Sequence, residues 1–267
     1  MRSWLKVHWP GVAAGALVLL ALCGMLLTPH DPAAQAFIAE RLAGPSAGHW
    51  LGVDGLGRDF FSRMWLGTAN TILLGSTASV LTLLLGAGLL SAERGGPRWF
   101  GGIVRNMVSV GIAMPVLFVG LLLLVFLKPS APALVAAVAI GGVPFAFRQL
   151  RVIWTEQANA LHVLASRALG ATTDHLVRFT IWPNVRSQVW SLAKILFAVS
   201  VLELSGLTFL GLTGDPDLAE LGTLLRQNQA HLFQQSFLVV WPGVVLTGLL
   251  LLVQLSAIRG RETARTN

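Results

Sequence analysis

The chain has 267 residues, of which 54% are hydrophobic and only 12% are charged, and its mean hydropathy is +0.70. Soluble domains carry about 25% charged residues, so this chain lacks the charge that a water-exposed surface requires. The composition excludes a disordered chain, a disulfide-rich secreted domain and a typical soluble enzyme. It predicts an all-α polytopic membrane protein. The single cysteine, Cys23, can form neither an intrachain disulfide nor a cysteine cluster, and we interpret it as an apolar filler.

Six apolar stretches approach the length of about 20 residues that a helix needs to cross a bilayer. They cover residues 10–28, 68–92, 103–127, 131–147, 187–210 and 236–257. The first stretch follows basic residues, as in a secretory signal peptide, but it is longer than the usual apolar region of such peptides. We therefore expect it to be retained, which gives six transmembrane helices.

The basic residues are distributed unevenly between the segments that separate these spans. If the N-terminus is inside, fourteen of the 19 Lys and Arg residues lie in inner segments and five in outer segments. Cytoplasmic loops are enriched in Lys and Arg, so both termini are predicted to be cytoplasmic. This topology accounts for the net charge of +7 without any nucleic-acid partner.

Three segments between the spans are long enough to carry functions of their own. They are an outer loop at 29–67, an inner loop at 148–186 and a second outer loop at 211–235. No internal repeat separates the chain into further parts, so we treat residues 1–267 as a single transmembrane domain.

The inner loop is predicted to contain two short helices. An apolar face with helical spacing marks the first helix and consists of Leu161, Leu164, Ala165 and Ala168. Gly170 follows at the position where a left-handed residue closes a helix. Thr172 or Thr173 can cap the second helix, with Asp174 in its first turn, and Pro183 is expected to end it. The bent pair either packs on its own bundle or docks a cytoplasmic partner.

The inner loop resembles the signature of permease subunits of ABC importers. That signature is Glu-Ala-Ala, three residues, Gly, nine residues, and then Ile-x-Leu-Pro. Gly170 and Pro183 have the matching spacing. The other signature positions are occupied here by Leu164, Ala165, Ser166, Thr180 and Trp182. The match is therefore one of spacing more than of residue identity.

The first outer loop narrows this resemblance. Residues 49–67 closely resemble the segment before the second span in permeases of the dipeptide/oligopeptide/nickel family. The matching residues are His49, Leu51, Gly52, Asp54, Leu56, Gly57, Arg58, Asp59, Ser62 and Arg63. Stretches at 113–124, 207–225 and 239–243 agree in the same order, so the resemblance covers most of 49–256.

The residues of this outer motif also suggest a physical role. Phe60, Phe61, Met64 and Trp65 fall on one helical face, opposite Arg58, Asp59, Ser62 and Arg63. Such an amphipathic turn is suited to lying at the membrane interface, while glycines at 52, 55 and 57 permit close approach. The motif either anchors the second span or contacts a delivered ligand or binding protein.

A few residues within the spans are candidates for a substrate path. Met114 and Pro115 are expected to kink the third span. Glu203 is the one acid placed inside a span, where charge is costly and usually faces a cavity or a partner; the alternative is a solvated position at the outer edge. Relatives often carry their acid one position later, where this chain has Leu204, so no family role is assigned to Glu203.

Residues that would support chemistry within this chain are missing from the sequence. The six histidines are scattered without ligand spacing, so no metal site is expected. Neither a catalytic Ser/His/Asp motif nor a phosphate-binding loop is present, so no catalytic residue and no cofactor are expected. Any energy for transport must then come from another chain.

The resemblance implies the type I ABC importer permease fold in a bacterial inner membrane. It also implies a second homologous permease, two cytoplasmic ATPases that bind ATP and Mg²⁺, and an extracytoplasmic binding protein. The ATPase-coupling residues would be Ala165, Ser166, Gly170, Ala171, Thr172, Asp174, His175 and Pro183.

The cargo implied by the resemblance is a di- or oligopeptide. The same architecture could instead carry nickel or a metal–opine chelate. A stand-alone secondary transporter or channel is the alternative from another class, but such proteins usually show internal repeats or several intramembrane polar groups. The chain itself is expected to be a translocation subunit rather than an enzyme.

Overall fold

A computed structural model describes residues 15, 19, 23 and 28–265, and side chains up to residue 255. Helices make up the regular structure of this described part, apart from one isolated antiparallel bridge between Val53 and Asp59. This agrees with the all-α prediction. The first predicted span, 10–28, falls almost entirely outside the described residues.

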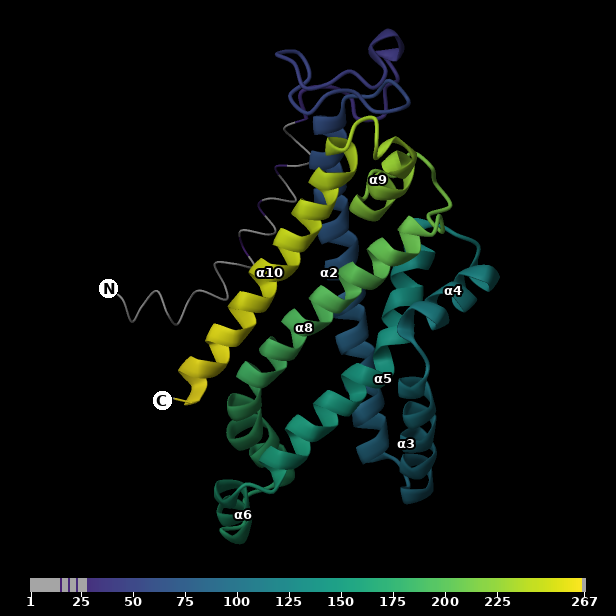
Figure 1. Cartoon of the computed structure of the whole chain (residues 1–267). Helices are drawn as coiled ribbons and strands as arrows, with labels where there is room; N and C mark the ends of the chain where they lie inside the picture. Colours follow the sequence, from purple (N-terminus) through teal and green to yellow (C-terminus); the bar gives the residue numbers. More distant parts are fainter. Residues whose placement is uncertain (1–14, 16–18, 20–22, 24–27, 266–267) are drawn as a thin grey trace, which may run out of the picture.

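The helices form a slanted bundle with a loop cap at one end and two short helices at the other (Figure 1). In chain order they are η1 (Ile38–Glu40), α2 (Phe60–Gly95), α3 (Arg98–Ala113), α4 (Val116–Leu127), α5 (Ala131–Ala158), α6 (Leu161–Ala168), α7 (Thr173–His175), η2 (Leu176–Ile181), α8 (Trp182–Phe209), α9 (Leu221–Asn228), η3 (Gln229–His231) and α10 (Phe237–Arg265). We call the loop-capped end the α9 end and the opposite end the α6 end.

Four helical segments of the described part are long and apolar enough to cross a membrane. They are Phe60–Gly95, Ala131–Ala158, Thr173–Phe209 and Phe237–Leu255. The pair α3 and α4 forms a fifth candidate if it is counted as one broken span. The described residues therefore contain a counterpart for each predicted span except the first.

The third predicted span, 103–127, is not a single helix. The axes of α3 and α4 differ in direction by 100° at the break between them. Pro115 provides no N–H group and disfavours helical geometry in the residue before it, so Met114 is extended, with φ −88° and ψ 134°. The expected kink is thus present as a complete interruption of the helix.

The predicted inner loop, 148–186, is mostly helical. Helix α5 continues to Ala158, and the segment from Thr173 to Phe209 is continuous. The prediction that Pro183 ends a helix is wrong, because the helical segment continues through this residue at the start of α8. The preceding turn, η2, widens into a π-helix, and the side chain of Asn184 donates a hydrogen bond to the Thr180 carbonyl at 2.7 Å.

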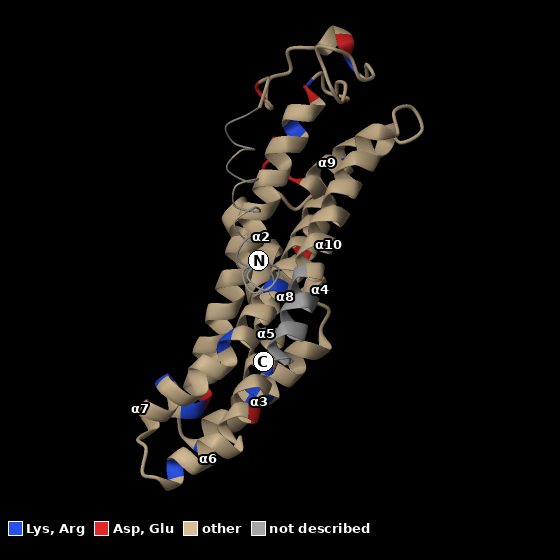
Figure 2. Ribbon diagram, turned by 90° about the vertical axis from the view of Figure 1, so that its left-hand side faces the viewer, with Lys and Arg blue, Asp and Glu red and all other residues tan. Residues whose placement is uncertain are grey.

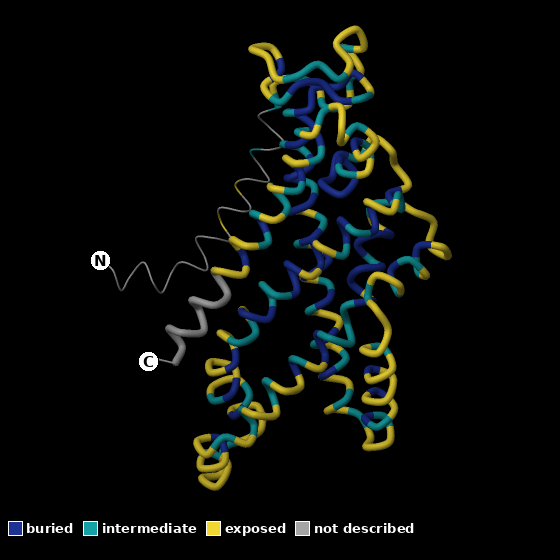
Figure 3. The backbone as a smooth tube through the Cα atoms, viewed as in Figure 1, coloured by how far each residue is buried: buried dark blue, intermediate teal, exposed yellow. Residues whose placement is uncertain are grey.

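Helices α2, α5 and α8 pack closely along a buried seam (Figure 3). Small residues on α5 allow this approach, which is the usual basis of helix packing in membranes. The Thr82 hydroxyl on α2 lies 2.8 Å from the Ala78 carbonyl and 3.3 Å from the Ala139 carbonyl on α5. Helix α10 packs on α2 and α8 through Leu249 and Val253.

Candidate functional site

The outer-loop motif forms a buried charge network at the α9 end. Arg58 and Arg63 are fully buried. The guanidinium of Arg58 donates to Asp54 and to Asp217, each at 3.0 Å. Both arginines also donate to the Gln227 side chain, at 3.2 and 3.1 Å. The network ties the first outer loop to the segment that contains α9, more than 150 residues later.

Asp59 joins this network to the start of α2. One carboxylate oxygen accepts the backbone N–H of Ser62 at 2.8 Å, which caps the helix, and the other lies 2.8 Å from His49 Nδ1. Burial alone would raise the pKa of Asp59, but hydrogen bonds from His49 and Ser62 and the nearby His30 lower it below its ordinary value. Asp59 therefore acts as a buried, ionised cap.

Two motif glycines permit the tight turns of this loop. Gly52 and Gly57 have φ values of +79° and +77°, which L-residues with side chains rarely adopt. A side chain at position 57 would also collide with the backbone of Ile38. The turns bring His49 and Asp54 against the first residues of α2.

Both faces of the expected amphipathic turn make contacts within the α9 end. Phe60 and Met64 are buried against Leu221, Leu224 and Leu238 in the interior of the α9 end. The opposite, charged face is buried as well, because its side chains are paired. Phe61 and Trp65, from the same predicted face, are half-buried. The contacts of the motif are those of an anchor for α2.

Helix α9 begins after a fully buried acid, Glu220, which lies within the segment predicted as an outer loop, 211–235. Its carboxylate accepts hydrogen bonds from the hydroxyls of Thr71 and Ser205, at 3.0 and 2.7 Å, and from that of Thr208. It also accepts the backbone N–H groups of Gly222 and Thr223. The acid thus caps α9 and fixes it between α2 and α8.

Two of the three candidate path residues line one pocket beside the break between α3 and α4. The pocket has a volume of about 190 Å³, and its walls include Met114, Glu203, Gly142 and Phe145. Pro115 lies between the lining residues Met114 and Val116. The Oε2 atom of Glu203 is buried and makes no hydrogen bond within the described part of the chain. A carboxylate oxygen at a largely apolar pocket is suited to meeting a cationic group.

The α6 end forms an elbow, which we define as residues 161–181. Gly170 has a φ of +86°, and the N–H of Ala171 donates to the Ser166 carbonyl at 3.1 Å, which closes α6 in a Schellman motif. Thr172 then caps α7 by accepting the N–H of His175. These local predictions are confirmed. Asp174 lies in the first turn of α7, as expected from the sequence.

The elbow is attached through one face and exposed on the other. Val163, Leu176 and Ile181 are buried in a cluster with α5 and α8. The predicted apolar face points outward, since Leu161 is 85% exposed and Leu164, Ala165 and Ala168 are exposed. The attachment is made instead by Val163, which lies off that face.

The remaining predicted coupling residues lie on the surface of the elbow. Asp174 and His175 are both exposed; Asp174 pairs with Arg178 at 2.8 Å, while the His175 ring packs against Phe179. Pro183 is exposed at the start of α8. Figure 2 shows Lys and Arg gathered at the α6 end, close to α3, α6 and α7.

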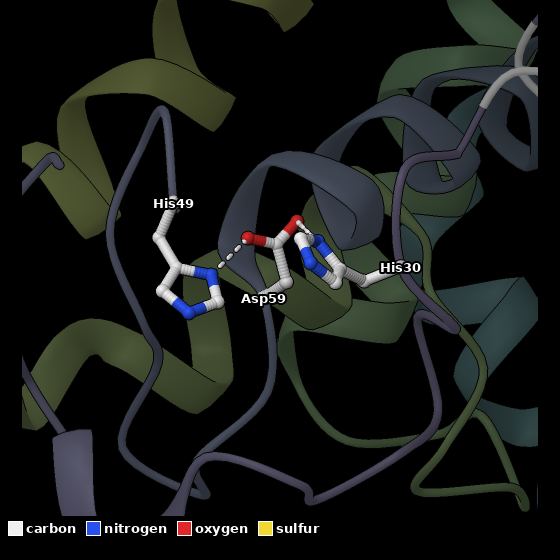
Figure 4. A group of neighbouring side chains, drawn as sticks. All are labelled: His30, His49 and Asp59. Carbon is white, nitrogen blue, oxygen red and sulfur yellow. Dashed lines mark hydrogen bonds and ion pairs between the residues drawn. The ribbon is translucent and has the colours of Figure 1, made fainter. Parts of the chain in front are cut away.

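Two features of the α9 end were missed by sequence reasoning. The pairing of Arg58 and Arg63 with Asp217 and Gln227 joins residues too far apart for any local pattern to reveal. Glu220 had a readable signal, because an acid directly before a short helical stretch is a plausible N-cap. The structure also brings together His30 and His49, which the sequence leaves 19 positions apart, next to Asp59 (Figure 4).

Comparisons with known proteins agree with this architecture. Residues 84–259, more than half of the chain, match the family described as binding-protein-dependent transport system inner membrane component. The di/tripeptide transport system permease protein DppC of Pseudomonas aeruginosa is 30% identical over 90% of this chain and 82% of its own length. The glutathione transport system permease protein GsiD of Pectobacterium atrosepticum is 29% identical over 92% of this chain and 82% of its own length.

Solved structures share the fold. An amino acid ABC transporter chain has a TM-score of 0.64 at 18% identity, over 76% of this chain and 95% of that one. A chain of the inward-facing MetNI methionine ABC transporter has a TM-score of 0.57 at 21% identity, over 78% and 95%. The fold is thus that of ABC transporter chains. Together with the family match, these findings show that the chain belongs to the binding-protein-dependent transport system inner membrane components, the permeases of ABC importers.

Proposed function

We propose that this chain is the permease subunit of an ATP-driven importer for short peptides in a bacterial inner membrane. The family match and the peptide permeases among its relatives support this function. The single observation that carries it is the elbow, a capped pair of short helices with an exposed apolar face on a permease fold. A subunit without a phosphate-binding loop requires such an attachment to receive work from an ATPase.

We place the α6 end in the cytoplasm. The basic residues of this end include Arg94, Arg105, Arg151, Arg167 and Arg178. Enrichment in Lys and Arg favours the cytoplasmic side of the membrane. If residues 10–28 form the first span, the chain then has six spans with both termini in the cytoplasm. The α9 end then faces the extracytoplasmic side, where a binding protein would dock on the loop cap and the segment around α9.

The elbow would transmit ATP hydrolysis to the bundle. Each of two partner ATPases binds ATP and Mg²⁺, and one of them would receive the exposed face of α6 with Leu161 and Leu169 in a groove. Because Thr173–Phe209 is one continuous helix, movement of the elbow is passed along α8 toward Glu203 and Glu220. This continuity supports a mechanical connection between the elbow and the proposed path.

The substrate path would run past the break between α3 and α4. The pocket that contains Met114 and Glu203 lies on α3, α5 and α8, and a second homologous permease would complete the path. The unpaired Glu203 oxygen would meet the cationic amino terminus of a peptide as it passes. Peptide cargo is favoured over nickel or a metal–opine chelate because the named relatives transport peptides.

Replacing Glu203 with Gln tests this path. The Glu203→Gln variant removes the negative charge and preserves the shape, so we expect dipeptide uptake to fall about tenfold or more while the assembly still hydrolyses ATP. Uptake of labelled dipeptide by cells lacking the native chain and complemented with each variant measures the effect. Glu156→Gln, on an exposed acid of α5, is the matched control.

Two results would count against this proposal. Unchanged dipeptide uptake in Glu203→Gln would remove Glu203 from the path while leaving the peptide function intact. Normal dipeptide uptake in cells that lack the chain, together with loss of nickel uptake, would replace the peptide cargo with nickel.

A further inference from the structure

Three side chains with metal-binding atoms converge in the loop cap of the α9 end (Figure 4). They come from three separate stretches of chain: His30 from the first part of the loop, His49 from the motif, and Asp59 from the cap of α2. One ligand atom from each lies within 4.8 Å of those of the other two. Phe37 packs against both imidazole rings, with centroid distances of 5.4 and 4.3 Å, and provides an apolar wall.

His49 is held in the loop cap by two neighbouring carboxylates. The side chain is only 7% exposed and lies between two carboxylates, with Nδ1 at 2.8 Å from Asp59 and Nε2 at 3.6 Å from Glu40. A neutral imidazole carries one N–H, so it can donate to only one of these acceptors. An ion bound between Nδ1 and Asp59 would replace the proton that Nδ1 donates there, and the neutral ring would then carry its proton on Nε2, which faces Glu40.

His30 presents a second nitrogen without a partner to the same carboxylate. Its Nδ1 is buried and makes no hydrogen bond within the described part of the chain. The nearest Asp59 oxygen lies 3.8 Å away, which is beyond hydrogen-bonding distance but within the range for two ligands of one ion. The backbone N–H of His30 donates to the Ser62 hydroxyl at 3.2 Å, which holds this part of the loop over the start of α2.

From this geometry we infer that His30, His49 and Asp59 form a binding site for a divalent transition-metal ion of the Zn²⁺ or Ni²⁺ type. Two imidazole nitrogens and one carboxylate oxygen suit these borderline metals better than Mg²⁺ or Ca²⁺, which prefer oxygen ligands. Three protein ligands leave a fourth tetrahedral position for water. The earlier expectation of no metal site arose because sequence spacing alone does not bring His30 to the motif.

Binding of an ion would draw together three ligand atoms that already lie within 4.8 Å of one another. Metal–ligand distances of about 2.0–2.1 Å in a tetrahedron separate two ligands by about 3.3 Å. The 2.8 Å and 3.8 Å separations from Asp59 lie on either side of this value. Glu40, which is 58% exposed, would hold the outer nitrogen of His49 as an outer-shell carboxylate. The ion would tie residues 30 and 49 to the cap of α2.

Zinc binding to the full-length purified chain tests this site directly. The protein is prepared with a tag that lacks histidine, stripped with a chelator, and titrated with Zn²⁺ against a chromophoric competitor. We expect one equivalent to bind, with X-ray absorption showing imidazole ligands at about 2.0–2.1 Å. The His30→Ala variant should weaken this binding by at least about 100-fold, and Glu40→Gln by about tenfold.

His30→Ala is the informative variant because the His30 side chain accepts and donates no hydrogen bond among the described residues, while its backbone bond to Ser62 is retained. Circular dichroism confirms that the variant is folded. His231→Ala, at the same end of the bundle, and Glu203→Gln, at the proposed path, should bind Zn²⁺ as the wild type does. Unchanged Zn²⁺ binding in Glu203→Gln would show that the metal binds in the loop cap and not at the proposed substrate path.

Some results would overturn the inference. Wild-type protein that binds no equivalent of Zn²⁺, or a folded His30→Ala variant with wild-type affinity, would exclude the site. A loss of Zn²⁺ binding in His231→Ala as large as that in His30→Ala would show that the site does not consist of His30, His49 and Asp59 alone. None of these results bears on peptide uptake, because the site is independent of the proposed cargo.

Discussion

Glu220, Arg58 and Arg63 carry charge into the interior of the α9 end, and each makes several hydrogen bonds there. The carboxylate of Glu220 receives five hydrogen bonds, and the two arginines share Gln227. A buried charge without such partners would cost several kcal/mol. The sequence motif identified both arginines, but their partners Asp217 and Gln227 could not be predicted, since only the folded chain brings them close.

Removing the Glu220 carboxylate should destabilise the α9 end strongly. In Glu220→Ala the three hydroxyls and two backbone N–H groups lose their acceptor, so we expect a loss of about 3 kcal/mol or more in the free energy of unfolding. Thermal or denaturant unfolding of the purified protein in detergent measures this. The exposed Glu156→Ala serves as the control and should change stability by less than about 0.5 kcal/mol. Equal stability of both variants would contradict the account of Glu220.

At the scale of elements, helix ends with a local chemical cause were predictable and long-range packing was not. Gly170 and Thr172 close and open the helices of the elbow as their residue types indicate. The effect of Pro183 was predicted wrongly, because a proline can end a preceding helix or stand at the start of a following one. The π-helical turn before it, which joins it to the preceding helix, could not be read from the sequence. The apolar face of α6 was predictable, but its outward orientation was not, because an exposed apolar face and a core face have the same periodicity.

A bulky β-branched residue at position 170 should uncouple hydrolysis from transport. Gly170→Val places Val at φ +86°, at a cost of about 1–2 kcal/mol, and so distorts the closure of α6. We expect the variant to insert in the membrane and its assembly to hydrolyse ATP, while dipeptide uptake falls about tenfold or more. The matched control is Gly95→Val at the exposed end of α2, where a Cβ meets nothing within 4 Å. Normal coupling in Gly170→Val would remove the elbow from its proposed role.

For the whole molecule, composition predicted the membrane class, and loop motifs predicted the family, which the comparisons confirm. The order of the helices followed from the apolar stretches, apart from the break at Met114 and Pro115. The packing of α9 against α2, α8 and α10 could not be predicted, because a helix of eight residues with several polar side chains has the sequence pattern of a loop. The distribution of basic residues determines which end of the bundle we place in the cytoplasm. Without this charge asymmetry, the bundle could cross the bilayer in either orientation.

The single native cysteine makes this orientation testable by labelling. In a Cys23→Ser background, Trp50→Cys at the α9 end should react with a membrane-impermeant maleimide in intact spheroplasts. Leu169→Cys, at the exposed tip of the elbow, should react only after permeabilisation. Both native side chains are exposed, so accessibility differs only through the membrane. The reverse pattern would invert the proposed topology.

The most direct test of the central claim is ATP-dependent peptide uptake by proteoliposomes that contain the assembly purified through this chain. We predict that labelled dipeptide moves across the membrane when binding protein and hydrolysable ATP are supplied on opposite sides. A non-hydrolysable analogue should abolish movement, and the chain alone should hydrolyse no ATP. Equal dipeptide movement by the isolated chain without ATP would contradict its assignment as the permease subunit of an ATP-driven importer.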